Sequence, residues 1–132
     1  PEQQHRAGAD AEAARDAAQH AAGGDQRVRV GQGGAGRGND RVARFQLTKK
    51  SDYMQSFNLN LISATEIIRK ASDSLKKNKG SIVLFSTVAV RRGFINHSIV
   101  ASAKGAIVGL TVSLAAEFAP NIRVNCIAPS IT

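Results

Sequence analysis

The sequence has no tryptophan, one cysteine, one tyrosine, one methionine and three prolines. The single cysteine, Cys126, excludes an internal disulfide and suits a reducing compartment. We find no uninterrupted apolar run long enough to cross a bilayer, and no secretory signal. These absences favour a cytoplasmic protein with no membrane partner. The chain begins with Pro1 rather than methionine, so we expect a piece of a longer protein.

Aromatic side chains make up only 5% of the residues, although the net charge is +8. Nucleic-acid surfaces combine clustered cations with aromatic side chains on which bases stack. The lysines and arginines here are scattered along the chain, as at Lys49 and Lys50, Lys76 and Lys77, and 91–92. We interpret them as solvated faces and expect no nucleic-acid partner.

Residues 1–46 contain no leucine, isoleucine, lysine, serine, threonine, cysteine or methionine. Such a segment buries too little apolar area to offset the entropy of ordering it. We therefore expect it to be disordered or, over the alanine-rich residues 10–22, marginally helical. A change of composition like this marks either a linker or tail, or a segment translated in the wrong reading frame. We favour the second, because linkers usually carry serine and threonine; translating the coding DNA in the other frames tests it.

The stretch "RVRVGQGGAGRG" places Gly31, Gly33 and Gly36 in G-x-G-x-x-G spacing after a short strand-like run. Glycines with this spacing cradle a pyrophosphate when an apolar helix follows. The residues that follow, "RGNDRVARF", make a poor apolar helix. We therefore favour a coincidental match in a glycine-rich segment.

Residues 47–132 have the composition of a globular domain. Apolar residues on one face predict a helix over 52–77, begun by Asp52, and a second helix over 98–119. Continuous apolar runs predict buried strands at 81–86 and 122–128, with a loop at 87–97. The order helix, strand, helix, strand indicates an α/β fold with part of a Rossmann-like, doubly wound parallel sheet.

The ends of these two strands bring polar residues to one edge of the sheet, where ligands of such folds bind. Ser86 and Thr87 follow the first strand, and 129–132 follow the second. Three motifs in residues 52–132 form a recognisable set. They are "FNLNLISA", "GSIVLFSTVAV", and "SAKGAIVGLTVSLAAEFAPNIRVNCIAPSIT" with its S-x-K-[AG] and I-R-V-N-x-[IV]-x-P-G patterns. In these motifs the chain resembles the short-chain dehydrogenase/reductase family.

The resemblance implies an oxidoreductase that moves a hydride between NAD or NADP and a small carbonyl or alcohol substrate. It assigns Lys104 to the nicotinamide ribose and Thr87, with Ser86 beside it, to the substrate oxygen. It assigns Asn60 to a proton-relay water. Pro129 falls on the family proline and Thr132 on a threonine beside the nicotinamide, while Ser130 replaces a glycine. The resemblance also implies a homo-oligomer in the full-length parent.

Two departures from the family pattern bear on activity. The proton-transferring tyrosine, four residues before the lysine, is Val100, which neither donates nor accepts a proton. His97 lies on the same face if the helix extends that far, but we favour a polar surface role for it. Upstream, 59 residues precede Asn60, fewer than the roughly 90 that three βα units and their T-G-x-x-x-G-x-G turn require. The cofactor turn and the strands flanking 81–86 are therefore expected to be missing.

We conclude that the chain is a fragment of an NAD(P)-dependent short-chain oxidoreductase and expect it to be inactive as it stands. The alternative is a non-catalytic relative that acts through helix-mediated dimerisation, for which the small residues at 101–109 suit close packing.

Overall fold

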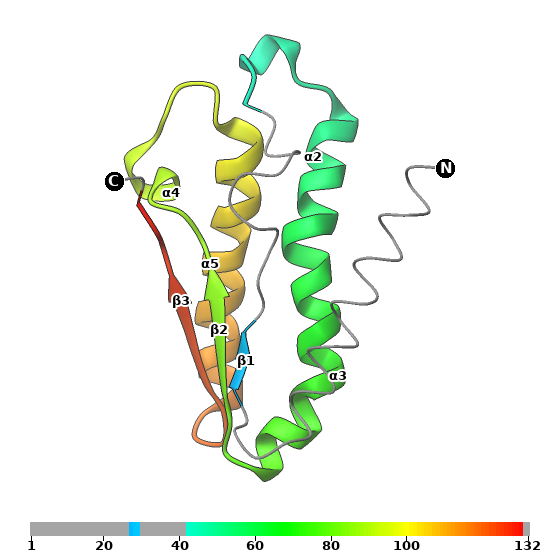
Figure 1. Ribbon diagram of the computed structural model, residues 1–132, viewed down its shortest axis with the longest axis vertical. Coiled ribbons are helices and arrows are strands. Elements are labelled where there is room, and N and C mark those ends of the chain that lie inside the picture. Colours follow the sequence, from blue (N-terminus) through cyan, green and yellow to red (C-terminus); the bar gives the residue numbers. More distant parts are fainter. Residues whose placement is uncertain (1–26, 30–41, 131–132) are drawn as a thin grey trace.

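The computed structural model describes residues 27–29 and 42–130, and three parallel strands form its sheet in the order β1-β2-β3 (Figure 1). β1 is Arg27–Arg29, β2 is Ser81–Phe85 and β3 is Arg123–Ile127. Val28 lies opposite Ile82, which in turn lies opposite Val124. The predicted parallel α/β arrangement is confirmed.

β2 is the central strand, which corrects the expectation that it has no flanking strand upstream. The strand-like run "RVRV" supplies that neighbour as β1. Gly31, Gly33, Gly36 and residues 10–22 lie outside the described residues. β3 also differs from the prediction of a fully buried strand, because it pairs only with β2 among the described strands. Buried Val124 in β3 accordingly lies between exposed Arg123 and Asn125.

The predicted helix over 52–77 is one continuous rod with a change of winding inside it. α2 (Lys50–Phe57) leads into a π-helical segment, η2 (Asn58–Ile62), and then α3 (Ser63–Lys77). The rod begins two residues earlier than predicted. Asp52 lies in its first turn, where the backbone N–H of Lys49 donates to the carboxylate at 2.9 Å. A short 3₁₀ helix, η1 (Phe45–Leu47), precedes the rod.

The segment at 87–97, predicted to be a loop, contains one helical turn, α4 (Ala89–Arg92). Gly93 ends this turn at a φ of 71°, a left-handed conformation that glycine adopts without strain. Val88 precedes the turn as its cap residue, and the backbone N–H of Ala89 donates to the Thr87 hydroxyl at 3.3 Å.

The last helix, α5 (Ser98–Phe118), contacts β2, β3, α2 and η2. Contrary to the expectation of no membrane-length apolar run, α5 is long and apolar enough to cross a bilayer, with a mean hydropathy of 1.7. Its contacts with both strands and the helical rod are those of a core helix in a folded domain.

The hydrophobic core lies between the sheet and the two long helices (Figure 1). Side chains from α3, β2, α5 and β3 fill it, among them Leu75, Ile82, Leu84, Ile107 and Val124. Both helices run from the edge where the strands end toward the edge where they begin (Figure 1). This arrangement brings the first turns of α5 beside the end of β2, which is where the predicted site lies.

Candidate functional site

The residues that follow β2 and β3 are held together by backbone hydrogen bonds. Ser86 N–H donates to Ile127 C=O at 2.7 Å, and Val88 N–H donates to Pro129 C=O at 3.3 Å. The parallel ladder thus continues past the ends of the strands. It brings Ser86 and Thr87 beside exposed Pro129, at the sheet edge where the sequence predicted them.

Ser86 and Lys104 form the centre of this edge. The Ser86 hydroxyl donates to the backbone carbonyl of Lys104 at 3.0 Å, and the Lys104 ammonium donates to the carbonyl of Phe85 at 3.3 Å. Both residues are buried, with exposed fractions of 5% and 9%. A buried cation loses its hydration, so it requires acceptors in fixed positions. The two hydrogen bonds therefore couple the position of α5 to the end of β2.

Thr87 and Ser86 differ in what their hydroxyl groups do. The Ser86 hydrogen is used in the bond to Lys104, whereas the Thr87 oxygen accepts the N–H of Ala89. An accepting hydroxyl keeps its own hydrogen for another acceptor. Thr87 is also only half-buried. Of the two neighbouring hydroxyls, Thr87 is therefore the better donor toward a ligand at this edge.

Val100 lies one helical turn before Lys104 in α5 and is buried, with 9% exposed. Residues four apart share one helix face, so Val100 and Lys104 lie on the same face of α5. The site thus has a cation and hydroxyl groups, but no proton donor at position 100.

Asn60 lies in the π-helical segment and is 2% exposed. Its Nδ2 donates to the backbone carbonyl of Ser56 at 2.9 Å and lies 3.3 Å from the Ser56 hydroxyl. π-Helical turns occur often at functional sites because they displace one residue from the regular helix. η2 packs against α5, which brings the segment carrying Asn60 to the helix that carries Lys104.

His97 is the cap residue before α5 rather than part of its first turn. Its Nδ1 lies 2.7 Å from the carbonyl of Ile95, a contact that requires the hydrogen on Nδ1. Its ring also lies 5.6 Å from that of Phe94. These contacts tie the imidazole to the preceding loop; a catalytic role for it stays a hypothesis that the geometry does not favour. Thr132, the remaining predicted site residue, lies outside the described residues.

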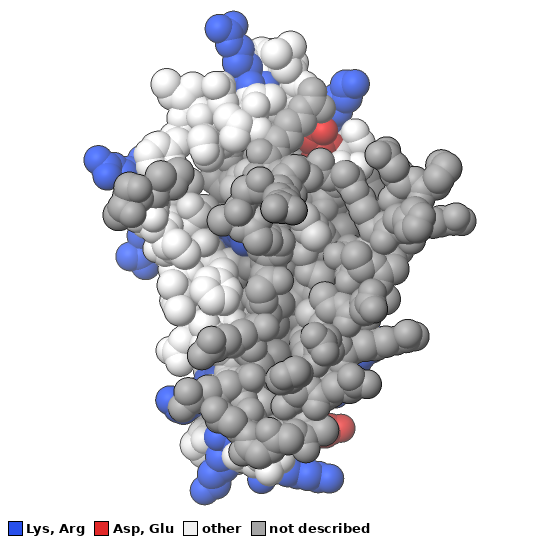
Figure 2. Space-filling model, in the orientation of Figure 1, with Lys and Arg blue, Asp and Glu red and all other residues white. Residues whose placement is uncertain are grey.

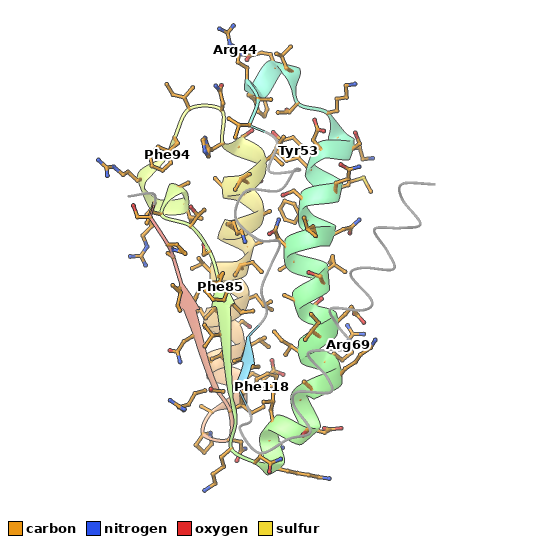
Figure 3. The ribbon with its side chains drawn as sticks, viewed as in Figure 1. Arg44, Tyr53, Arg69, Phe85, Phe94 and Phe118 are labelled. Atoms are coloured by element: carbon orange, nitrogen blue, oxygen red, sulfur yellow. The ribbon has the colours of Figure 1, made fainter. Side chains whose placement is uncertain are left out.

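A chain of hydroxyl groups joins α2 to the start of α5, and no sequence pattern indicates it. Tyr53, the single tyrosine of the chain, lies 2.9 Å from the Ser98 hydroxyl and 3.1 Å from that of Thr48. Tyr53 lies toward α5 in Figure 3. Because 45 residues separate Tyr53 from Ser98, no local spacing could have revealed this contact. It holds the first turn of α5 two residues before Val100.

Comparison with known proteins gives one consistent family. The family profile described as "Enoyl-(Acyl carrier protein) reductase" matches residues 9–132. The L-xylulose reductase of Bos taurus is 36% identical over 90 residues, which cover 66% of this chain and 36% of the relative. The chain thus spans little more than a third of that curated relative.

Solved structures of this family resemble the fold over about two thirds of this chain. A short chain dehydrogenase/reductase family protein is 30% identical with a TM-score of 0.64, over 67% of this chain and 38% of that one. An NAD⁺-bound xylitol dehydrogenase is 31% identical with a TM-score of 0.63, over 67% of this chain and 35% of that one.

We predict that Ser86→Ala lowers the free energy of unfolding by about 1 kcal/mol, because it removes a buried hydrogen bond between β2 and α5. The matched control is Ser102→Ala. The Ser102 hydroxyl also donates to a backbone carbonyl of α5, that of Ile99, but it is exposed to solvent. The control should change stability by under about 0.5 kcal/mol. Urea unfolding followed by circular dichroism measures both, and equal losses would contradict a specific role for Ser86.

Proposed function

Because the chain belongs to the short-chain dehydrogenase/reductase family, we propose that it forms the substrate side of an NAD(P)-dependent oxidoreductase acting on a small carbonyl or alcohol. The observation that carries this proposal is the pair of hydrogen bonds joining Ser86, Lys104 and Phe85 at the end of β2. They hold a buried ammonium at the sheet edge where ligands of parallel α/β folds bind.

The residues at this edge fit the nicotinamide end of NAD or NADP. Ribose hydroxyls accept hydrogen bonds, and the Lys104 ammonium is a donor whose position the protein fixes. Pro129 and, outside the described residues, Thr132 are the further residues we assign to the nicotinamide. When bound, the nicotinamide supplies or accepts the hydride. The protein residues bind and orient both reactants.

We assign the contact with the substrate oxygen to Thr87, whose hydroxyl retains its hydrogen for a new acceptor. Ser86 is then a positioning residue, because its hydroxyl hydrogen holds Lys104. Asn60, on the neighbouring π-helical segment, is assigned to the water that relays protons. These roles follow the family pattern at matching positions and are supported by the burial of Ser86, Lys104 and Asn60.

Val100 supplies no proton, so we propose that the chain as it stands orients reactants without efficient turnover. General acid catalysis by a positioned group contributes about 10²–10⁴-fold to a rate, and this contribution is absent here. Asn60, Thr87 and Lys104 keep the amide, hydroxyl and ammonium groups of the family pattern, which favours an altered site of this family rather than an unrelated one.

The boundary at residue 46 and the wrong-frame origin of residues 1–46 stay proposals. The family profile begins its match at residue 9, and β1 lies inside this segment. A cytoplasmic location also stays a proposal; the free thiol of Cys126 fits a reducing compartment.

We predict that Val100→Tyr introduces turnover, because it puts a phenol one turn before Lys104. The control is Val100→Phe, which adds nearly the same bulk without the hydroxyl. The assay uses millimolar NADH or NADPH, because the glycine-rich cofactor turn is expected to be missing, and a panel of small aldehydes and ketones. Oxidation of the nicotinamide should be at least about 100-fold faster for the tyrosine variant than for the original chain. Nicotinamide fluorescence should show binding by both.

Two results would count against the proposal in different ways. If both variants bind the nicotinamide but neither turns over, the assignment of position 100 is wrong. If neither the variants nor the original chain bind it, the oxidoreductase proposal itself fails.

The second candidate function is non-catalytic dimerisation through α5. Its outward side is rich in small or exposed residues, and Val112 is 67% exposed. A Cβ added at Gly109 would meet nothing within 4 Å, so that side is open in the single chain. Small side chains allow a second helix to approach closely.

We predict that Gly109→Leu weakens dimerisation by at least about tenfold without unfolding the chain, because the added side chain enters open space in the monomer only. The control, Gly109→Ala, should stabilise the helix by about 1 kcal/mol and dimerise nearly as the original does. Sedimentation equilibrium measures the association. An original chain that is monomeric at micromolar concentration would rule this function out.

A further inference from the structure

Two segments that are distant in the sequence meet beyond the ends of the strands and expose apolar side chains there. One is residues 42–47, before α2, and the other is residues 93–97, before α5. The backbone N–H of Ala43 donates to the carbonyl of Asn96 at 3.1 Å, which fixes the two segments beside each other.

The exposed apolar side chains of these segments are large. Ile95 is 86% exposed, Phe45 68% and Leu47 63%. Val42 and Phe94 are about half exposed, at 53% and 45%. We refer to these five residues as the rim patch. Arg44 and Phe94, one from each segment, lie at this end of the molecule in Figure 3. Single exposed apolar residues are ordinary, but several on neighbouring segments mark an interaction surface.

Cations surround the rim patch. The exposed basic residues of the same region are Arg44, Lys49, Lys50, Arg91 and Arg92. The only acidic residue between 42 and 60 or between 86 and 104 is Asp52. Its carboxylate accepts the backbone N–H of Lys49 at the start of α2. Figure 2 shows the blue cationic groups at this end among white, uncharged side chains, with a red acidic group beside them.

We propose that the rim patch and its five surrounding cations dock the protein on an anionic lipid bilayer. An anionic membrane surface attracts Lys and Arg, while the boundary between headgroups and acyl chains accepts apolar side chains. Phe45 and Phe94 could stack on nucleic-acid bases, but the other three residues of the rim patch, Val42, Leu47 and Ile95, are aliphatic and cannot. Their presence among the cations favours a bilayer over a nucleic acid.

The prediction of no membrane partner depended on the absence of a bilayer-crossing run and of a secretory signal, and the cations were interpreted as scattered, solvated faces. The fold brings five of these cations to one end. This inference concerns a surface and does not depend on the proposed oxidoreductase activity.

The opposite end of the molecule provides an internal comparison. Lys76, Lys77, Lys79 and Arg123 are exposed there, near the edge where the strands begin. Within residues 63–81 and 117–126, which the structure describes, no large apolar side chain is among the highly exposed ones. A purely electrostatic attraction would use both ends, whereas docking through the rim patch uses one.

The test is co-sedimentation of the 132-residue chain with vesicles of phosphatidylcholine alone and with vesicles that are about one-third phosphatidylserine. We expect binding to the anionic vesicles only. Arg91→Gln combined with Arg92→Gln should weaken it about fivefold for each cation removed, which corresponds to about 1 kcal/mol each. Phe45→Ser combined with Leu47→Ser should weaken it about tenfold or more.

Two matched controls carry similar changes outside the rim patch. Lys76→Gln with Lys77→Gln removes two cations from the opposite end, and Val112→Ser removes an exposed apolar side chain from α5. Both should bind as the original does. Circular dichroism verifies that every variant keeps its helices.

Three outcomes would overturn the proposal. The first is no binding to anionic vesicles. The second is an equal loss of binding in the Lys76 and Lys77 control, which would indicate non-specific attraction. The third is a rim-patch variant that loses self-association but not vesicle binding, since the patch would then contact a second copy of the chain.

Discussion

Two hydrogen bonds join the end of β2 to α5, and the rest of the candidate site depends on them. One runs from the Ser86 hydroxyl to the Lys104 carbonyl, and the other from the Lys104 ammonium to the Phe85 carbonyl. Together they fix where a buried cation lies relative to the sheet edge. A hydrogen bond that involves a charged group contributes about 1.5–3 kcal/mol, more than an average neutral one. The burial of Lys104 is therefore tolerated because its partners are in place.

The site keeps this cation and the hydroxyl of Thr87 while position 100 is apolar. The methyl groups of Val100 suit its packed position in α5, since Val100 is as buried as Lys104. A buried lysine contributes little to stability that an apolar residue could not provide. In the proposed function, Lys104 is present for the nicotinamide ribose, to which the cation can donate even without a proton donor at position 100.

Much of the fold could be predicted because its patterns are local. The apolar run at 81–86 and the small-residue helix carrying Lys104 both lie close to their observed bounds. The run "RVRV" is strand-like in sequence, but its pairing with β2 could not be predicted, because the two strands are far apart along the chain. The π-helical turn at Asn60 could not be predicted from the apolar spacing either, because the buried residues there are Ser56 and Asn60 rather than the apolar Phe57 and Leu61. The contact of Tyr53 with Ser98 and the gathering of Arg44 with Arg91 depend on tertiary packing, which no spacing along the chain encodes.

The measurement that tests the central claim most directly is a titration of the ¹⁵N-labelled chain with NADPH and with NADH, followed by NMR of the backbone amides. We predict concentration-dependent shifts for Ser86, Thr87 and Lys104 with at least one of the two, and none for Gly109 or Lys76. No shifts at millimolar nucleotide, or shifts confined to residues away from the end of β2, would contradict a nicotinamide site at this edge.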